Sequence, residues 1–213
     1  MRRRAAVLIS GRGSNLGALI AAAASPEYPA EIALVLANRA DAAGLTRAAA
    51  AGVPVEIIEH SRFHGDRGAH EAAMDAALRA AGIELVCLAG YMRLLTPLLV
   101  GRWAGRMLNI HPSLLPAFPG LHTHARALAA GVRVHGCTVH LVTEATDSGP
   151  ILAQAAVPVL PDDDEDRLAA RVLIQEHRLY PLALRLIAGG GAGVAPAPDT
   201  ALCNPLPSGE VPE

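Results

Sequence analysis

Short apolar runs alternate with amphipathic stretches along the first half of the chain. Residues 5–9 form a continuous apolar run that ends at two glycines, which is typical of a parallel strand buried on both faces. An Ala- and Leu-rich stretch then continues to about residue 24 and predicts a helix, with Ser14 and Asn15 as candidate N-caps. A strand, a glycine turn and a helix therefore open the chain.

The same alternation continues as far as residue 110 and predicts a parallel sheet, because strands that alternate with helices are joined by right-handed crossovers. Further strands are predicted at 31–37, 53–58, 84–89 and 106–110, and further helices at 41–51 and 63–81.

The second half of the chain has a different pattern. Strands are predicted at 134–142 and 151–157 around a turn at 147–150, followed by a helix over 166–188 that is interrupted at Pro181. We predict an α/β fold: one doubly wound, mostly parallel, Rossmann-like domain over 1–188 with a mixed, antiparallel C-terminal edge. The Gly-, Pro- and Ala-rich residues 189–213 are expected to form a mobile tail.

Composition excludes several classes of protein. All 18 basic residues are arginine, so Schiff-base chemistry, a pyridoxal-phosphate anchor and a Walker A loop are excluded, because each requires lysine. A net charge of −2 argues against nucleic acid as a partner. The 3 cysteines are far apart and predict neither disulfides nor a zinc site. The first apolar run is too short for a signal peptide or a membrane span, so we expect a cytoplasmic protein without a membrane partner.

A glycine-rich loop, residues 11–15, connects the first strand to the first helix. Free backbone N–H groups and the positive end of the helix dipole meet there, which favours an anion. A dinucleotide fingerprint would place glycine at position 16 and an acidic residue after the second strand, where this chain has Leu16 and Asn38. The loop therefore fits a monophosphate better than NAD, and a tight turn without a ligand is the alternative.

Asn109 and His111 lie at the end of a predicted strand, directly before Pro112. Side chains alternate along a strand, so these two point to the same side and can converge on one substrate atom. His111 could move a proton, and Asn109 could donate a hydrogen bond to an oxyanion. Asp147 lies in a loop that could return to the same edge, where its carboxylate would favour protonated His111 and fix its orientation. The alternatives are a structural pair and an Asx turn before Gly149.

Other candidates are weaker. His122 and His124 are two residues apart without a third ligand, so no metal is expected. His135 and His140 are expected on a strand as hydrogen-bonded structural residues. Ser113 is interpreted as a turn former, because nothing near it resembles a nucleophile elbow.

Five segments together resemble a known family: residues 7–15, 88–95, 108–116, 119–124 and 147–152. They are similar to the phosphoribosylglycinamide formyltransferases, folate-dependent enzymes of purine synthesis, and the likeness extends from about residue 5 to residue 189. The segment Asn-Ile-His-Pro-Ser-Leu-Leu-Pro and the later aspartate are shared by formyltransferases generally and indicate the chemistry. The glycine loop and Gly-Leu-His-Thr-His point to the purine enzymes.

The resemblance implies a role for each group of residues. Asn109, His111 and Asp147 would be the catalytic trio, which promotes direct attack of an amine on the formyl group of 10-formyltetrahydrofolate without a metal. The ribonucleotide would be held by Gly13, Ser14, Asn15, Leu16 and Glu176. The folate would contact Arg67, Met92, Arg93, Leu94, Leu95 and Asn109, and the loop of Thr143, Glu144, Ala145, Thr146 and Asp147.

The expected partners are thus two small molecules, and the expected state is a monomer or homodimer. A formyltetrahydrofolate deformylase, in which water is the acceptor, is the alternative function. A catalytically silent nucleotide- or folate-binding protein is a remote alternative, because the trio is complete. Arg12, Tyr91 and Ser148 depart from the family pattern, and Ser148 bears on the shape of the folate loop.

Overall fold

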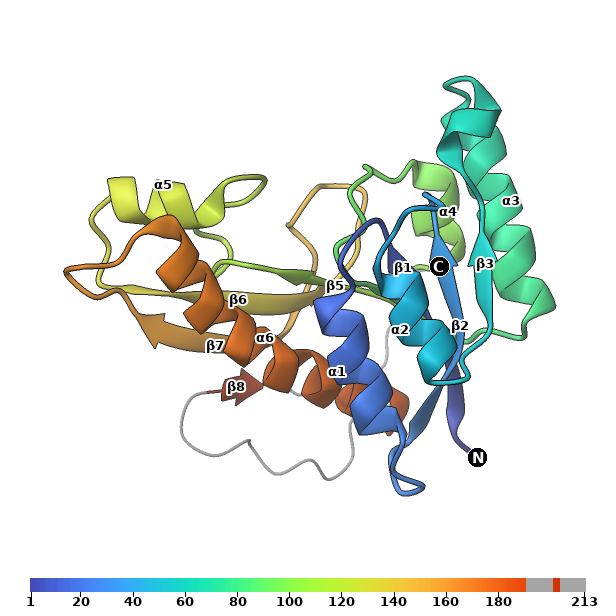
Figure 1. The fold of residues 1–213 in the computed structure, drawn as a ribbon, viewed down its shortest axis with the longest axis horizontal. Coiled ribbons are helices and arrows are strands. Elements are labelled where there is room, and N and C mark those ends of the chain that lie inside the picture. Colours follow the sequence, from blue (N-terminus) through green and yellow to red (C-terminus); the bar gives the residue numbers. More distant parts are fainter. Residues whose placement is uncertain (191–200, 204–213) are drawn as a thin grey trace. The chain divides into compact units, whose positions relative to one another are not determined.

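The computed structural model describes residues 1–190 and, for the backbone alone, residues 201–203 (Figure 1). The chain divides into two compact units, one over residues 1–109 and one that begins at Ile110. Most of the tail predicted over 189–213 lies outside the described residues. Within it, β8 (Ala201–Cys203) pairs antiparallel with β7 (Ile151–Pro158).

The first unit is built on a parallel sheet with the strand order β3-β2-β1-β4-β5. Its strands are β1 (Arg3–Ile9), β2 (Ala30–Ala37), β3 (Val55–Ile57), β4 (Leu85–Leu88) and β5 (Met107–His111). Residues 5–9 of β1 have no exposed surface, because β1 has a strand on each side and its apolar side chains are covered on both faces. The prediction of a buried parallel strand at 5–9 is therefore confirmed.

Helices connect these strands. They are α1 (Ser14–Ala23), α2 (Gly44–Ala50), the 3₁₀ helix η1 (His60–Phe63), α3 (Arg67–Ala80) and α4 (Pro97–Arg102). Helix α1 packs against α2, and α3 against α4. The sequence pattern did not predict α4, because six residues are too few to show a helical period.

The start of α1 differs from the prediction. Its N-cap is Gly13 with a φ of 65°, and no side chain caps the helix, so the expectation that Ser14 or Asn15 would be the N-cap is wrong. A left-handed backbone at this position favours glycine. A Cβ on Gly13 would also lie 2.7 Å from the Cα of Gly44, at the start of α2. The second helix, predicted over 41–51, is observed over Gly44–Ala50.

The third helix also begins later than predicted. Asp66 caps it, because its carboxylate accepts a hydrogen bond of 2.9 Å from the backbone N–H of Ala69. The expected start at Phe63 lies in η1 instead. Trp103 is buried, and its indole N–H donates to a carboxylate oxygen of Asp75 at 3.0 Å, so this residue belongs to the core.

The second unit contains the antiparallel pair β6 (Val134–Leu141) and β7, which confirms the predicted hairpin. Helix α6 (Glu165–Ala188) packs on both strands and on the short helix α5 (Thr123–Ala129). The predicted interruption at Pro181 is wrong: α6 continues through it. A proline removes a single N–H bond, and buried side chains before and after it hold the helix against the strands.

The last two residues of β5, Ile110 and His111, are assigned to the second unit. Within residues 1–190 and 201–203, no helix has both the length and the apolar character that a membrane span requires.

Candidate functional site

The glycine loop of the first unit presents the start of α1 at the carboxyl end of β1. Gly13 turns the chain, and Ser14, Asn15 and Leu16 form the first turn of the helix. Asn15 and Leu16 are buried, whereas Ser14 is partly exposed. The first backbone N–H groups of α1 have no partner within the helix, so the loop can bind an anion, as predicted for a phosphate.

Two of the predicted folate residues of the first unit, Arg67 and Leu94, are in contact. The guanidinium of Arg67 donates a hydrogen bond to the carbonyl of Leu94. The backbone N–H of Met92 donates to the hydroxyl of Ser10, directly after β1, at 2.9 Å. Met92 and Leu94 expose 69% and 66% of their surface. An apolar surface next to a cation therefore lies at the carboxyl edge of the parallel sheet, where α/β proteins bind ligands.

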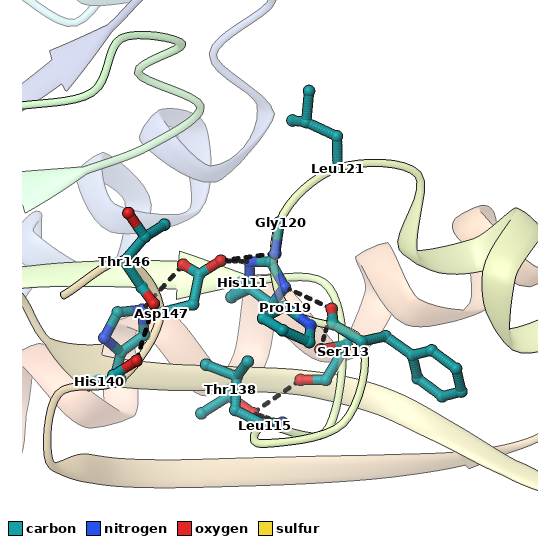
Figure 2. Close-up of polar contacts among 12 residues, drawn as sticks. His111, Ser113, Leu115, Pro119, Gly120, Leu121, Thr138, His140, Thr146 and Asp147 are labelled. Atoms are coloured by element: carbon teal, nitrogen blue, oxygen red, sulfur yellow. Dashed lines mark hydrogen bonds and ion pairs between the residues drawn. The ribbon is translucent and has the colours of Figure 1, made fainter.

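His111 ends β5, and Asn109 lies two residues earlier on the same side of the strand. The imidazole of His111 is buried, and its Nε2 donates to the carbonyl of Phe118 at 3.1 Å. Its Nδ1 lies 3.4 Å from Oδ2 of Asp147, so the predicted contact between His111 and Asp147 is confirmed (Figure 2). Both neighbours are acceptors, and the ring can donate to both only as an imidazolium.

Asp147 lies in the loop between β6 and β7 and has a second imidazole beside it. Its Oδ2 accepts a hydrogen bond of 2.8 Å from the backbone N–H of Gly120. Its Oδ1 lies 3.7 Å from Nε2 of His140. Figure 2 shows the carboxylate between His111 and His140. The φ of Asp147 is 53°, a left-handed conformation that Asp tolerates better than most residues do.

The loop that carries the Phe118 carbonyl is held by buried polar groups. The Ser113 hydroxyl lies 2.6 Å from the carbonyl of Ala117 and 3.1 Å from that of Phe118, and it has no exposed surface. The hydroxyl of Thr138, on β6, donates to the Ser113 carbonyl at 2.7 Å and accepts from the N–H of Leu115 at 3.0 Å. These contacts agree with the interpretation of Ser113 as a structural residue.

Sequence reasoning missed His140, Gly120 and the Phe118 carbonyl as neighbours of the trio. A signal for His140 was present, because Gly136, Thr138 and His140 alternate along β6 and so share one face. A Cβ on Gly136 would lie 2.9 Å from Leu114, which places that face against the loop after His111. No sequence pattern identifies Gly120 or Phe118, because they contribute backbone atoms only.

Two of the other histidines pair with each other. Nε2 of His135, on β6, lies 3.2 Å from Nδ1 of His124, on α5. Among residues 1–190, no three His, Cys, Asp or Glu side chains are grouped as a metal site would require.

The remaining predicted residues are placed as follows. Glu176 is a buried residue of α6 in the second unit. Thr143, Glu144, Ala145 and Thr146 are exposed in the loop that leads to Asp147, and the hydroxyl of Thr143 donates to the carbonyl of Ala145 at 3.1 Å. An exposed loop of this kind is available to a ligand.

His135 predicts a loss of stability in acid. Burial, and then the charge of His124, lower the pKa of His135 to about 4 from 6.5. Between these pH values the unfolded chain binds the proton more readily, so stability is complete above pH 6.5 and falls as the pH drops toward 4. The measurement is the free energy of unfolding in denaturant at pH 7 and at pH 4.5. Between these two pH values we expect it to fall by about 2–3 kcal/mol less in His135→Gln than in the wild type. His64→Asn, at an exposed histidine, is the control and should change the pH dependence little.

The fold and these contacts define the class of protein. A buried histidine held between a carboxylate and a carbonyl, next to an asparagine at a strand end of an α/β sheet, can move protons and stabilise the oxyanion of an acyl-transfer reaction. The chain belongs to the formyl transferase family, whose model matches residues 3–184.

Similar proteins agree with this assignment and with the predicted α/β fold. The crystal structure of phosphoribosylglycinamide formyltransferase from Brucella melitensis is 55% identical with a TM-score of 0.85, covering 92% of this chain and 98% of that one. The Escherichia coli phosphoribosylglycinamide formyltransferase is 46% identical, with 86% of each chain covered. The trifunctional purine biosynthetic protein adenosine-3 of Drosophila melanogaster is 48% identical over 92% of this chain, which spans only 14% of that relative's length.

Proposed function

We propose that this protein transfers the formyl group of 10-formyltetrahydrofolate to the amine of 5-phosphoribosylglycinamide, a step of purine (IMP) biosynthesis. Membership of the formyl transferase family and the names of relatives of similar length support this proposal. The observation that carries it is the buried ring of His111, which lies between the carboxylate of Asp147 and the carbonyl of Phe118.

In the proposed reaction the amine nitrogen attacks the formyl carbon, and the carbonyl electron pair moves onto oxygen. The resulting oxyanion would be stabilised by the amide N–H of Asn109 and by protonated His111. Nε2 of His111 would exchange the Phe118 carbonyl for the substrate, while Oδ2 of Asp147 stays beside Nδ1 and orients the ring. The amine then loses its proton, N10 of the folate gains one, and the C–N10 bond breaks to release tetrahydrofolate. No covalent enzyme intermediate is formed.

Orientation of the two substrates would supply much of the rate, because well-aligned reactants gain roughly 7–11 kcal/mol over free ones. In this proposal the phosphate binds at Gly13, Ser14, Asn15 and Leu16, and Glu176 receives the ribose or amine end of the ribonucleotide. The folate contacts Arg67, Met92, Arg93, Leu94 and Leu95, together with Asn109 and residues 143–147.

The test follows the formyl group. Purified protein is mixed with 10-formyltetrahydrofolate, with and without the ribonucleotide, and loss of the formyl group is recorded optically. We expect release that depends on the ribonucleotide. Release without it would identify a hydrolase, and no release in either mixture would contradict the proposal.

The glycine loop separates the transferase from the deformylase alternative. The double substitution Ser14→Ala and Asn15→Ala removes the donors proposed for the phosphate, and a hydrogen bond to a charged group contributes about 1.5–3 kcal/mol. We expect the KM for the ribonucleotide to rise at least about tenfold while the KM for the folate stays unchanged. Ser25→Ala, at an exposed serine after α1, is the control. An enzyme that keeps full activity after the double substitution does not use this loop for its acceptor.

The cytoplasmic location and the monomeric or homodimeric state stay predictions.

A further inference from the structure

Asp147 has two imidazole neighbours, and the proposed chemistry uses only one of them. The Gly120 N–H and the ring of His111 both lie at Oδ2. The other oxygen, Oδ1, faces His140. A carboxylate held through one oxygen can rotate about its Cβ–Cγ bond, whereas a partner at the second oxygen restricts that rotation.

His140 is itself held firmly. It is 3% exposed near the end of β6, and its Nδ1 donates to the Leu141 carbonyl at 2.9 Å. A carbonyl only accepts, so Nδ1 carries the hydrogen, and Nε2 is left facing Asp147. Burial lowers the pKa of His140, while its bond to the Leu141 carbonyl and the charge of Asp147 oppose that effect. The charged and titratable groups around it are Asp147 from the β6–β7 loop and His111 from β5.

We propose that His140 is a positioning residue for Asp147: its imidazole restrains the Oδ1 side of the carboxylate, so that Oδ2 stays directed at His111. Nε2 and Oδ1 are 3.7 Å apart and, with the ring hydrogen on Nδ1, both are acceptors, so the restraint acts through a water that donates one hydrogen to each of them. The kinetic part of this inference rests on the proposed function. The other part, that His140 maintains the contact between Asp147 and His111, does not depend on the proposed function.

The competing explanation is that His140 only fills space. Three variants separate the two explanations. His140→Leu fills the space without a polar group, and His140→Gln keeps an amide donor that can reach Oδ1. His135→Leu is the matched control, because His135 is an equally buried histidine of the same strand whose interactions are with His124 and the backbone of Pro112, whereas His140 faces Asp147.

The first measurement needs no catalysis. Nitrogen-15 NMR of the histidine rings at pH 7 reports whether Nδ1 of His111 has a carboxylate partner. We expect the His111 Nδ1 resonance to move in His140→Leu and to stay in place in His140→Gln and His135→Leu. An unchanged resonance in His140→Leu overturns the proposal. If that variant does not fold, His140→Asn replaces it, because its shorter amide does not reach Oδ1 as His140→Gln does.

The second measurement is steady-state kinetics. Misplacing a reacting group by about 1 Å can cost 10²-fold, so we expect kcat to fall roughly 10–100-fold in His140→Leu, with both KM values within about twofold. His140→Gln should recover most of kcat. Equal losses in His140→Leu and His140→Gln, or an equal loss in His135→Leu, would overturn the positioning role. Absence of ribonucleotide-dependent release in the wild type would refute the proposed function instead, and the NMR result would still decide the role of His140.

Discussion

His111→Ala is expected to lower the kcat of the proposed formyl transfer by at least about 100-fold, while the dissociation constant of the folate should change little. The size follows from the 10²- to 10⁴-fold that a positioned acid–base group contributes. The ring leaves behind the Phe118 carbonyl and the Asp147 carboxylate, neither of which can donate to an oxyanion. Steady-state kinetics together with folate binding, measured by fluorescence titration, separate the two effects.

Asp147→Asn should lower kcat for a related reason. The amide keeps the shape of the side chain but removes the carboxylate charge that lies 3.4 Å from Nδ1 of His111 and orients the ring. In the proposed mechanism the two residues act as a unit, so the double variant should be scarcely slower than His111→Ala alone. Asp162→Asn, at an exposed carboxylate of the second unit, is the control. Near-normal turnover in either single variant, or strictly multiplied losses in the double variant, would contradict the assigned roles.

Gly149→Ala is expected to have the largest effect on folding. A Cβ on Gly149 would lie 1.8 Å from the carbonyl oxygen of Leu141 and 2.9 Å from its carbonyl carbon, and both belong to the backbone. The Leu141 carbonyl also accepts the bond from His140, and the N–H of Leu141 donates to the Pro150 carbonyl at 2.9 Å. The strand end must therefore shift, and we expect a loss of about 3 kcal/mol or more in urea unfolding.

The same substitution should lower activity in whatever fraction folds, since Asp147 lies in the displaced loop. Gly101→Ala is the matched control, because a Cβ on Gly101 of α4 meets nothing within 4 Å. It should leave stability unchanged or raise it by about 0.5–1 kcal/mol, as alanine favours a helix over glycine. A Gly149→Ala variant as stable as Gly101→Ala would contradict this prediction, because it would show that the end of β6 accommodates the added Cβ without loss of stability.

Several features of the fold could be predicted because they depend on local pattern. The apolar run at 5–9, cut off by glycines, can be only a short buried strand, and the alternation of strands and helices implies parallel pairing. The late helix of the second unit was predicted to within one residue at its start, because its amphipathic period is long. Short α4 and α5 have too few turns for such a signal.

Other features depend on neighbours that are distant in the sequence. The cap of α1 is Gly13 because the chain must turn left-handed where Gly44 approaches it. Trp103 is in the core because the Asp75 carboxylate, 28 residues earlier, accepts its N–H. Pro181 stays within a helix because packing on β6 and β7 outweighs one lost bond.

The candidate site divides in the same way. The sequence by itself determined the residue types, namely an asparagine and a histidine at alternate positions of a strand end and an aspartate in a later loop, because strand periodicity and family motifs are properties of the linear chain. Only the tertiary structure decided which atoms meet: Oδ2 of Asp147 with Gly120 and His111, Oδ1 with His140, and Nε2 of His111 with a carbonyl. Backbone donors and acceptors have no side-chain identity, so no sequence pattern distinguishes them until folding brings them to the site.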